Sequence, residues 1–422
     1  MSRRAVITGV GVVAPGAIGL KSYWKLLSEG RSATRVITNF DASPYRSRIA
    51  GEVDFDPRRE GLSPQEIRRL DRAAQFAVVS AREAVADAGL ELDQIDPTRT
   101  GVALGTAVGC TTSLEEEFVI GSDRGRNWEV DQAYTVPWLY DYFTPSSMAA
   151  ELAWLAGAEG PVSVVSTGCT SGLDSVGYAA ELIAEGGVDV AITGGTEAPL
   201  SPITTVCFDV IRASSTRNDE PASACRPFDR TRDGLVLGEG AAILVLEELE
   251  HARRRGARIY GEVAGFASRC NAYHMTGLHP EGREMSDAID VAMAGARVSA
   301  RDVDYINAHG SGTKQNDLHE TGAFKRSLGA AAYDIPVSGF KSMIGHSLGA
   351  IGSLEIAGCL MAMREGVIAP TANLHEPDPQ CDLDYVPLVA REKQVDTVLT
   401  VGSGFGGFQS AMVLRNVEGD AR

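Results

Sequence analysis

Cys169, His309 and His346 are the residues of this sequence whose types and surroundings best suit nucleophilic and acid–base chemistry. Cys169 lies in the segment STGCTSG, directly after an apolar run and at the expected start of a helix. Backbone N–H groups and the helix dipole stabilise an anion at such a place, which favours a thiolate. The alternative is a buried, unreactive cysteine, the usual situation of a free thiol. The glycines and hydroxyls around Cys169 leave both interpretations open.

Both histidines lie beside small residues that leave room for a substrate. His309 follows an apolar run in INAHGSGT, where Ser311 and Thr313 offer hydroxyls to a polar chain. His346 lies in KSMIGHSLG. A neutral imidazole donates one N–H to a developing enolate or oxyanion, so two imidazoles near one thiol could hold negative charge on a thioester oxygen. The alternative is a loop histidine whose hydrogen bonds are satisfied by its neighbours.

Lys341 precedes His346 by five residues and could set the electrostatics of the same pocket. We expect its ammonium to pair with Glu355 or Glu320, because an opposite charge nearby favours the charged form of both partners. The alternative is an ordinary surface lysine.

Two competing motifs are weaker. Residues 345–349, GHSLG, match the G-x-S-x-G elbow of serine hydrolases and acyltransferases. Such an enzyme needs an acid and a histidine downstream, and only His375 follows, in a turn-like LHEPDP context. Cys270, His274 and His279 fit no standard metal-ligand spacing, so we expect no metal site.

Composition narrows the partners and the compartment. The 422 residues carry a net charge of -17 and a pI of about 4.9, which argues against nucleic acid as a partner. No run of about 18 apolar residues suggests a membrane span. The seven cysteines are scattered and odd in number, so they indicate neither a disulfide framework nor a zinc site. A reducing cytoplasm fits these features best.

Short apolar runs alternate with longer helical patterns, which predicts an α/β fold with layered helices. The expected strands are 4–10, 100–105, 162–166, 188–194, 241–246, 257–266, 303–308, 336–338, 397–401 and 410–415. The expected helices are 63–88, 170–185, 285–296, 315–328 and 348–365. Several strands are continuously apolar, as in a sheet that is covered on both faces.

Two pairs of segments share a layout, which suggests two related halves. The segments SVVSTGCTSGLDSVGYAAELIAEGG and PVSGFKSMIGHSLGAIGSLEIAGCLMAMREG each predict a strand, a polar turn and a helix of small residues. The segments GEGAAILVLEE and GSGFGGFQSAMVLRN each predict a glycine-rich turn and a strand. We expect the halves to divide at about residues 250–257.

At these motifs the sequence resembles the β-ketoacyl synthases of the thiolase superfamily over essentially the whole chain. The resemblance is carried by STGCTSGLDSVGYA, NAHGSGTKQND, KSMIGHSLGAIGSLE, SGFGGFQSAMVL and STRNDEPASACRPFDRTRDGLVLGEGA. Within that family it is most similar to the alpha ketosynthase subunit of type II aromatic polyketide synthases. The resemblance implies a thiolase-like fold in which two βαβαβαββ halves form five layers, α-β-α-β-α. The halves would be residues 1–252, with the nucleophilic cysteine, and 253–422, with both histidines and the lysine.

The resemblance also implies roles. Cys169 would accept the growing acyl chain, and its N–H and that of Phe405 would form an oxyanion hole. His309 and His346 would hold the malonyl thioester and stabilise the enolate left by CO2 loss. Lys341 would support the site electrostatically, and Phe405 would gate the acyl pocket. Which histidine assists decarboxylation stays open.

The remaining implied residues support or receive the substrate. Glu320 or Glu355 would pair with the lysine, and Ser311 and Thr313 would line the phosphopantetheine tunnel. No tightly bound cofactor is expected, because phosphopantetheine arrives on an acyl carrier protein. The candidate residues for docking this acidic carrier, with an ordinary solvated face as the alternative, are Arg68, Arg69, Arg72 and Arg212.

The implied activity is an acyltransferase reaction, the decarboxylative Claisen condensation of malonyl-acyl carrier protein with a cysteine-bound polyketide chain. The implied partner is a chain-length-factor subunit, which usually has Gln in place of the nucleophile; Cys169 places this chain on the catalytic side. The alternatives are a homodimeric fatty-acid-type synthase, a non-catalytic partner subunit and a serine acyltransferase. Chain length, starter unit and final product depend on the partner and on later enzymes.

Overall fold

The computed structural model describes residues 3–127 and 129–417. Its centre is an eleven-stranded sheet with the order β12-β11-β15-β16-β10-β1-β9-β7-β5-β6, and β2 pairs with β1. Smaller sheets join β3-β4-β8 and β13-β14.

The strands of the large sheet are β1 (Ala5–Ala14), β2 (Ala17–Ile18), β5 (Thr100–Gly105), β6 (Val162–Val165), β7 (Val190–Glu197), β9 (Gly240–Glu248), β10 (Gly261–Cys270), β11 (Tyr305–Asn307), β12 (Val337–Ser338), β15 (Thr397–Gly404) and β16 (Phe408–Arg415). The other strands are β3 (Arg35–Val36), β4 (Ile49–Gly51), β8 (Leu237–Gly238), β13 (Val367–Ile368) and β14 (Arg391–Glu392). The helices are α1 (Leu20–Ser28), α2 (Pro64–Arg69), α3 (Arg72–Ala88), α4 (Thr111–Gly121), α5 (Leu139–Phe143), α6 (Ser146–Ala156), α7 (Ser171–Ala184), α8 (Pro202–Val210), α9 (Leu249–Arg254), α10 (Arg283–Ala296), α11 (Lys314–Leu328), α12 (Lys341–Ile344) and α13 (Ile351–Glu365).

The large sheet consists of two halves with the same pairing pattern. In β6-β5-β7-β9-β1 the successive pairs are parallel, parallel, antiparallel and antiparallel. In β12-β11-β15-β16-β10 the same sequence of pairings recurs. The halves meet where β1 pairs with β10 over two positions. The predicted pair of related halves is confirmed, and the echoing segments hold equivalent places, β6 with β12 and β9 with β16.

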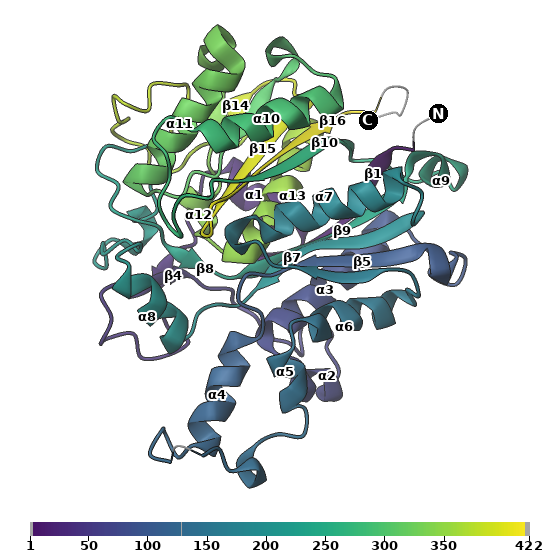
Figure 1. The fold of residues 1–422 in the computed structure, drawn as a ribbon, viewed down its shortest axis with the longest axis vertical. Helices are drawn as coiled ribbons and strands as arrows, with labels where there is room; N and C mark the ends of the chain where they lie inside the picture. Colours follow the sequence, from purple (N-terminus) through teal and green to yellow (C-terminus); the bar gives the residue numbers. More distant parts are fainter. Residues whose placement is uncertain (1–2, 128, 418–422) are drawn as a thin grey trace.

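The predicted five layers are also confirmed (Figure 1). Helices α3 and α6 cover the outer face of one half-sheet, and α10 and α11 lie on the outer side of the other. Helices α7 and α13 lie between the half-sheets and contact strands of both. Helix α13 is therefore buried along almost its whole length, and α7 is buried except on the face that carries Tyr178, Glu181 and Ala184.

Helices α7 and α13 approach each other closely at their N-termini because both carry glycine there. A Cβ atom at Gly172 would lie 2.7 Å from the carbonyl oxygen of Gly349. A Cβ atom at Gly352 would lie 2.7 Å from the backbone nitrogen of Leu173. The small-residue pattern therefore lets the two halves bring their central helices, and the turns before them, into one site.

Two expectations about helices were wrong. The pattern at 63–88 forms two helices, because Leu70 is extended and the side chain of Asp71 caps α3 by accepting from the N–H of Ala73. Helices within residues 111–156 were not expected. Helices α4 and α5 bury only Gly121 and Tyr142 and so lack the apolar stripe of a core-facing helix, whereas α6 buries such a stripe but leaves Trp154 exposed on its other face.

Candidate active site

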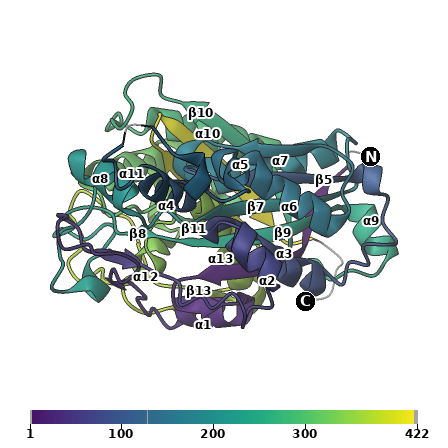
Figure 2. The same ribbon diagram turned by 90° about the horizontal axis from the view of Figure 1, so that it is seen from below.

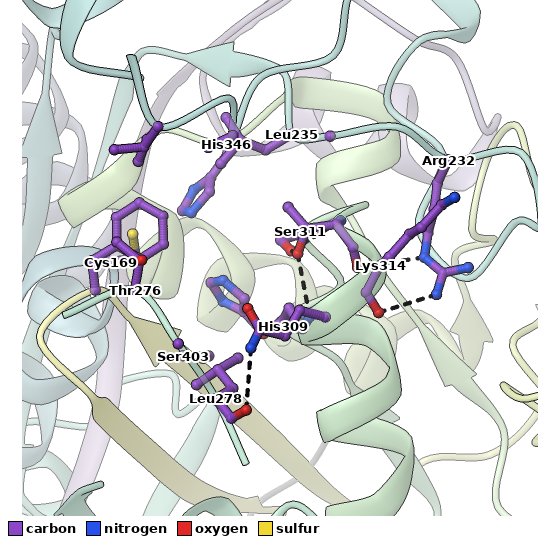
Figure 3. A pocket seen from close by; sticks show the side chains of 18 of the residues that line it. Cys169, Arg232, Leu235, Thr276, Leu278, His309, Ser311, Lys314, His346 and Ser403 are labelled. Atoms are coloured by element: carbon purple, nitrogen blue, oxygen red, sulfur yellow. Dashed lines mark hydrogen bonds between the residues drawn. The ribbon is translucent and has the colours of Figure 1, made fainter. Parts of the chain in front are cut away.

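Cys169, His309 and His346 face one cavity of about 610 Å³ (Figure 3). Cys169 comes from the turn after β6, His309 from the turn after β11, and His346 from the turn between α12 and α13. Strand ends of both halves therefore meet at this cavity. The fold thus brings Cys169 together with two histidines that follow it by 140 or more residues in the sequence, as the motifs predict.

Cys169 is almost fully buried in a 3-10 turn that leads into α7. Burial raises the pKa of its thiol to about 11, although Lys341 and the backbone N–H groups of Phe405 and Cys169 lower it. The expectation of a stabilised thiolate is therefore wrong for the resting site, because desolvation outweighs the favourable dipoles. The sulfur is nevertheless at the cavity wall with two N–H groups turned toward it.

The two histidine rings form an edge-to-face pair with centroids 5.2 Å apart. Burial and then the charge of Lys341 lower the pKa of both His309 and His346 well below the usual value. Both rings are therefore neutral, and each has one N–H to donate. The single N–H of a neutral imidazole is enough to donate to a developing enolate oxygen.

Lys341 pairs with Glu355, and Glu320 has a different task. The Nζ of Lys341 lies 2.7 Å from Oε1 of Glu355, and both side chains are buried. The same ammonium donates to the carbonyl oxygen of His309. Glu320 accepts from the backbone N–H groups of His309 and Gly310, so it fixes the turn that carries the first histidine. Burial raises the pKa of Glu320 to about 8 and that of Glu355 to about 7.

Ser311 and Thr313 line the cavity beyond His309, and their hydroxyls lie 3.0 Å apart. The Thr313 side chain also caps α11. Behind them the buried guanidinium of Arg232 is 3.1 Å from Asp317 and donates toward the carbonyl oxygens of Thr313 and Lys314. Polar side chains that are fixed by these hydrogen bonds therefore line the cavity next to the histidines.

Phe405 occupies the tight turn between β15 and β16 and lines the same cavity. Its ring stacks on Phe208 of α8 with centroids 6.1 Å apart. The next residue, Gly406, donates its N–H to the carbonyl oxygen of Met275 at 2.6 Å. The Phe405 turn and the wall at residues 275–278 are therefore held together.

The four arginines proposed for docking do not form one patch beside the cavity. Arg69 is bound by Glu151, and Arg72 by Glu239, so neither has a free charge to offer. Arg68 is exposed on α2 and does not line the cavity. Arg212 is exposed at the cavity, where Arg230 and Lys314, which sequence reasoning missed, also lie.

The competing motifs receive no support in the described part of the chain. Ser347 is buried and does not line the cavity, and its hydroxyl has no hydrogen-bond partner. His274 uses Nδ1 to accept from the backbone N–H groups of Thr276 and Gly277. Among the described residues no group of three His, Cys, Asp or Glu side chains is placed to hold a metal ion. In the same residues no helix has the length and hydropathy to cross a membrane.

Sequence reasoning missed two buried acids around the cysteine turn. Asp174 follows Cys169 by five residues on α7, and an acid within a small-residue helix was the available signal. Glu197, at the end of β7, accepts from the N–H groups of Ala107 and Gly349, and it follows a run of apolar and small residues.

Comparison with known proteins agrees with this geometry. The family model for "Beta-ketoacyl synthase, N-terminal domain" matches residues 2–252, and that for "Beta-ketoacyl synthase, C-terminal domain" matches residues 260–375. The tetracenomycin polyketide synthase ketoacyl synthase alpha subunit of Streptomyces glaucescens is 65% identical over 98% of this chain and 97% of its own length. The granaticin polyketide putative beta-ketoacyl synthase 1 of Streptomyces violaceoruber is 63% identical over 99% of each chain.

Solved structures agree as well. A type II polyketide synthase acyl-carrier protein in complex with its ketosynthase, bound to the hexaketide, matches with a TM-score of 0.91 and 38% identity over 99% of this chain and 100% of that one. The ishigamide ketosynthase/chain length factor matches with a TM-score of 0.90 and 34% identity over the same shares. The two related halves, the cavity between them and these likenesses lead to one conclusion: the chain belongs to the β-ketoacyl synthase family.

Proposed function

We propose that this chain is the catalytic ketosynthase of a type II polyketide synthase, joining malonyl units to a chain carried on Cys169. The observation that carries the proposal is the convergence of one thiol, two neutral imidazoles and two backbone N–H groups on a single cavity. These groups serve two separate steps, acyl transfer to sulfur and enolate formation.

In the first step the Cys169 sulfur attacks the carbonyl carbon of an acyl thioester. The oxyanion of the tetrahedral intermediate accepts hydrogen bonds from the backbone N–H groups of Cys169 and Phe405, and the carrier thiol then leaves. The resting thiol is neutral because its pKa is about 11. The proton that Cys169 loses is the one that the leaving sulfur takes up, so the exchange is neutral overall.

In the second step a malonyl thioester binds with its carbonyl oxygen at His309 and His346. Loss of CO2 leaves an enolate, and the imidazole N–H groups stabilise its oxygen. The enolate carbon attacks the acyl carbonyl on Cys169, and collapse of that adduct expels the sulfur. Breaking of that C–S bond frees the lengthened β-ketoacyl chain on the carrier, and the sulfur takes up one proton from solvent, which regenerates the thiol.

The substrate's phosphopantetheine arm fits the polar wall at Ser311 and Thr313, which leads from the surface to the histidines. The cationic side chains that line the cavity are Arg212, Arg230, Lys314 and the buried Arg232, which pairs with Asp317 and Asp378. Because Arg230 pairs with Glu376, we assign the attraction of the carrier's negative charge to Arg212 and Lys314, in place of Arg69 and Arg72. The chemistry needs no bound metal or redox group, since CO2 loss supplies the carbanion equivalent.

We propose a chain-length-factor subunit as the partner in a heterodimer. Strand β6 is the last strand of the sheet and has a neighbour on one side only. Helices α4, α5 and α6 lie beside one another (Figure 2). Their exposed apolar side chains are Phe118, Val119, Ile120, Tyr140, Phe143 and Trp154. Helix α6 packs against β6, and α5 connects α6 with α4. An unpaired strand edge and exposed apolar helix faces are both surfaces that a second subunit would cover.

Two further assignments accompany the proposal. We divide the chain into residues 1–252 and 253–422, with the boundary inside α9, which leads into β10. Residues 1–2, 128 and 418–422 of these halves lie outside the described residues. We place the reaction in the cytoplasm, because all seven cysteines are free thiols.

The test is turnover of malonyl-loaded carrier protein by the chain co-expressed with a chain-length factor. Cys169→Ala should abolish elongation, and Cys169→Gln should leave CO2 release running because the histidines are intact. Cys207→Ala, at an exposed thiol outside the cavity, is the matched control and should elongate normally. Elongation by Cys169→Ala would refute the mechanism. A stable homodimer that elongates chains alone would favour the fatty-acid-type alternative.

A further inference from the structure

Asp174 is a buried carboxylate that the mechanism above does not use. Its residue is 6% exposed, and its oxygens accept hydrogen bonds from three hydroxyls, those of Thr167, Thr170 and Ser410. Burial raises the pKa of Asp174, whereas these three hydroxyls lower it. Burying a carboxylate costs free energy unless hydrogen bonds compensate it, so a buried carboxylate that accepts from three hydroxyls indicates a specific task.

The three hydroxyls belong to the two segments that would supply the oxyanion hole. Thr167 and Thr170 are in the turn that contains Cys169, and the Thr170 bond to Oδ2 of Asp174 is 2.8 Å long. Ser410 is on β16 and donates to Oδ1. Strand β16 begins directly after the turn that carries Phe405. One carboxylate thus bridges the nucleophile turn and the hairpin of the second N–H donor.

We propose that Asp174 is a positioning residue that sets the N–H groups of Cys169 and Phe405 at the right separation for a tetrahedral oxyanion. The inference rests on the proposed function. The two donors come from different halves of the fold, so no shared strand or helix fixes their spacing. A misplacement of about 1 Å at a reacting centre can cost about 100-fold in rate. Besides the packing of the cysteine turn on β15 and β16, Asp174 connects the two donor segments through both of its oxygens.

The proposal separates the two half-reactions. Acyl transfer to Cys169 uses the oxyanion hole and depends on Asp174. Malonyl decarboxylation uses His309 and His346, whose turns Asp174 does not contact by any hydrogen bond among the described residues. Alkylation of the sulfur by iodoacetamide forms no oxyanion, so its final extent, as distinct from its rate, reports only whether the thiol is present and reachable.

The test compares Asp174→Asn with wild type in these three assays. The amide has one oxygen to accept with and places an NH2 group against a hydroxyl donor. We expect acyl transfer from a loaded carrier to slow about 10–100-fold, less than the ~10²–10³-fold of deleting a donor outright. The KM for the carrier, decarboxylation in the Cys169→Gln background and iodoacetamide alkylation should each stay within about twofold. Glu181→Gln, an exposed acid on the same helix, is the matched control and should change none of them.

A second variant keeps the proposal testable if Asp174→Asn does not fold. Ser410→Ala removes only the bond to β16, and it should slow acyl transfer about 5–20-fold while sparing alkylation. The double variant should be no slower than Asp174→Asn, because both changes break one connection. Equal losses in all three assays, or normal acyl transfer in either variant, would overturn the proposal. The proposed function itself would fail separately, through elongation by Cys169→Ala.

Discussion

Replacing Lys341 by methionine tests how the buried charges hold the site together. The ammonium and Glu355 are 2.7 Å apart with side chains 0% and 1% exposed. Methionine keeps most of the volume and removes the charge, which leaves the Glu355 carboxylate buried with its cation gone. Breaking such a pair costs ~3–5 kcal/mol, because the remaining charge is uncompensated. We expect the free energy of unfolding to fall by about that amount at pH 8.

The loss in free energy of unfolding of Lys341→Met, its stability deficit, should depend on pH in a defined direction. Burial raises the pKa of Glu355 and Lys341 lowers it, with a result of about 7. Without the lysine the folded-state pKa rises further above its unfolded value. A raised carboxyl pKa means that stability is full below the unfolded value, near pH 4.5, and is lost as the pH rises. The deficit of Lys341→Met should therefore grow between pH 5 and pH 8.

The assay is guanidinium unfolding at both pH values, with two comparison variants. Lys25→Met breaks an exposed pair with Glu29, whose atoms are 3.9 Å apart, and should cost less than about 1 kcal/mol. Lys341→Met combined with Glu355→Leu removes both charges and should recover part of the loss. A deficit for Lys341→Met below about 1 kcal/mol, or one that shrinks as the pH rises, would refute this account of the pair.

Three further outcomes are expected. The rate of Cys169 alkylation by iodoacetamide should rise about tenfold per pH unit toward pH 11, because the pKa of the thiol is about 11. A plateau near pH 9 would contradict a buried thiol that is neutral at rest. Glu320→Ala should release the turn that carries His309 and so slow decarboxylation about 10-fold or more. The assay is CO2 release in the Cys169→Gln background, and an unchanged rate would show that Glu320 does not hold that turn. Gly352→Ala should lower the free energy of unfolding by ~1–3 kcal/mol, because its Cβ would lie 2.7 Å from the Leu173 nitrogen. Gly295→Ala, whose Cβ would have its nearest neighbour at 3.9 Å, should not lower it. Equal effects of the two variants would show that the α7–α13 contact is not tight.

Much of the fold follows from the sequence because the buried strands are continuous apolar runs. Strand β5 begins and ends where the pattern predicts, and β9 and β16 extend only a few residues further. The repeated turn-and-helix layout in the sequence predicts the two halves. Its physical reason is visible at Gly172 and Gly352, since only small residues permit the contact between the central helices.

The parts that could not be predicted depend on long-range surroundings. The ionisation of Cys169 was misjudged, because the local turn indicates stabilising N–H groups but says nothing about the burial that raises the thiol pKa. The sequence makes Arg69 and Arg72 candidates for docking the carrier, but it does not show that Glu151 and Glu239, 82 and 167 residues away, neutralise them. The choice between Glu320 and Glu355 was likewise settled by three-dimensional contacts alone.

The most direct test of the central claim is the mass of the Cys169 peptide after incubation with an acyl-loaded carrier protein. The account predicts that the acyl mass is added to this peptide alone among the cysteine peptides, and that prior treatment with iodoacetamide prevents the addition. An acyl group found on Ser347, on another cysteine, or on no residue while products still form, would contradict it.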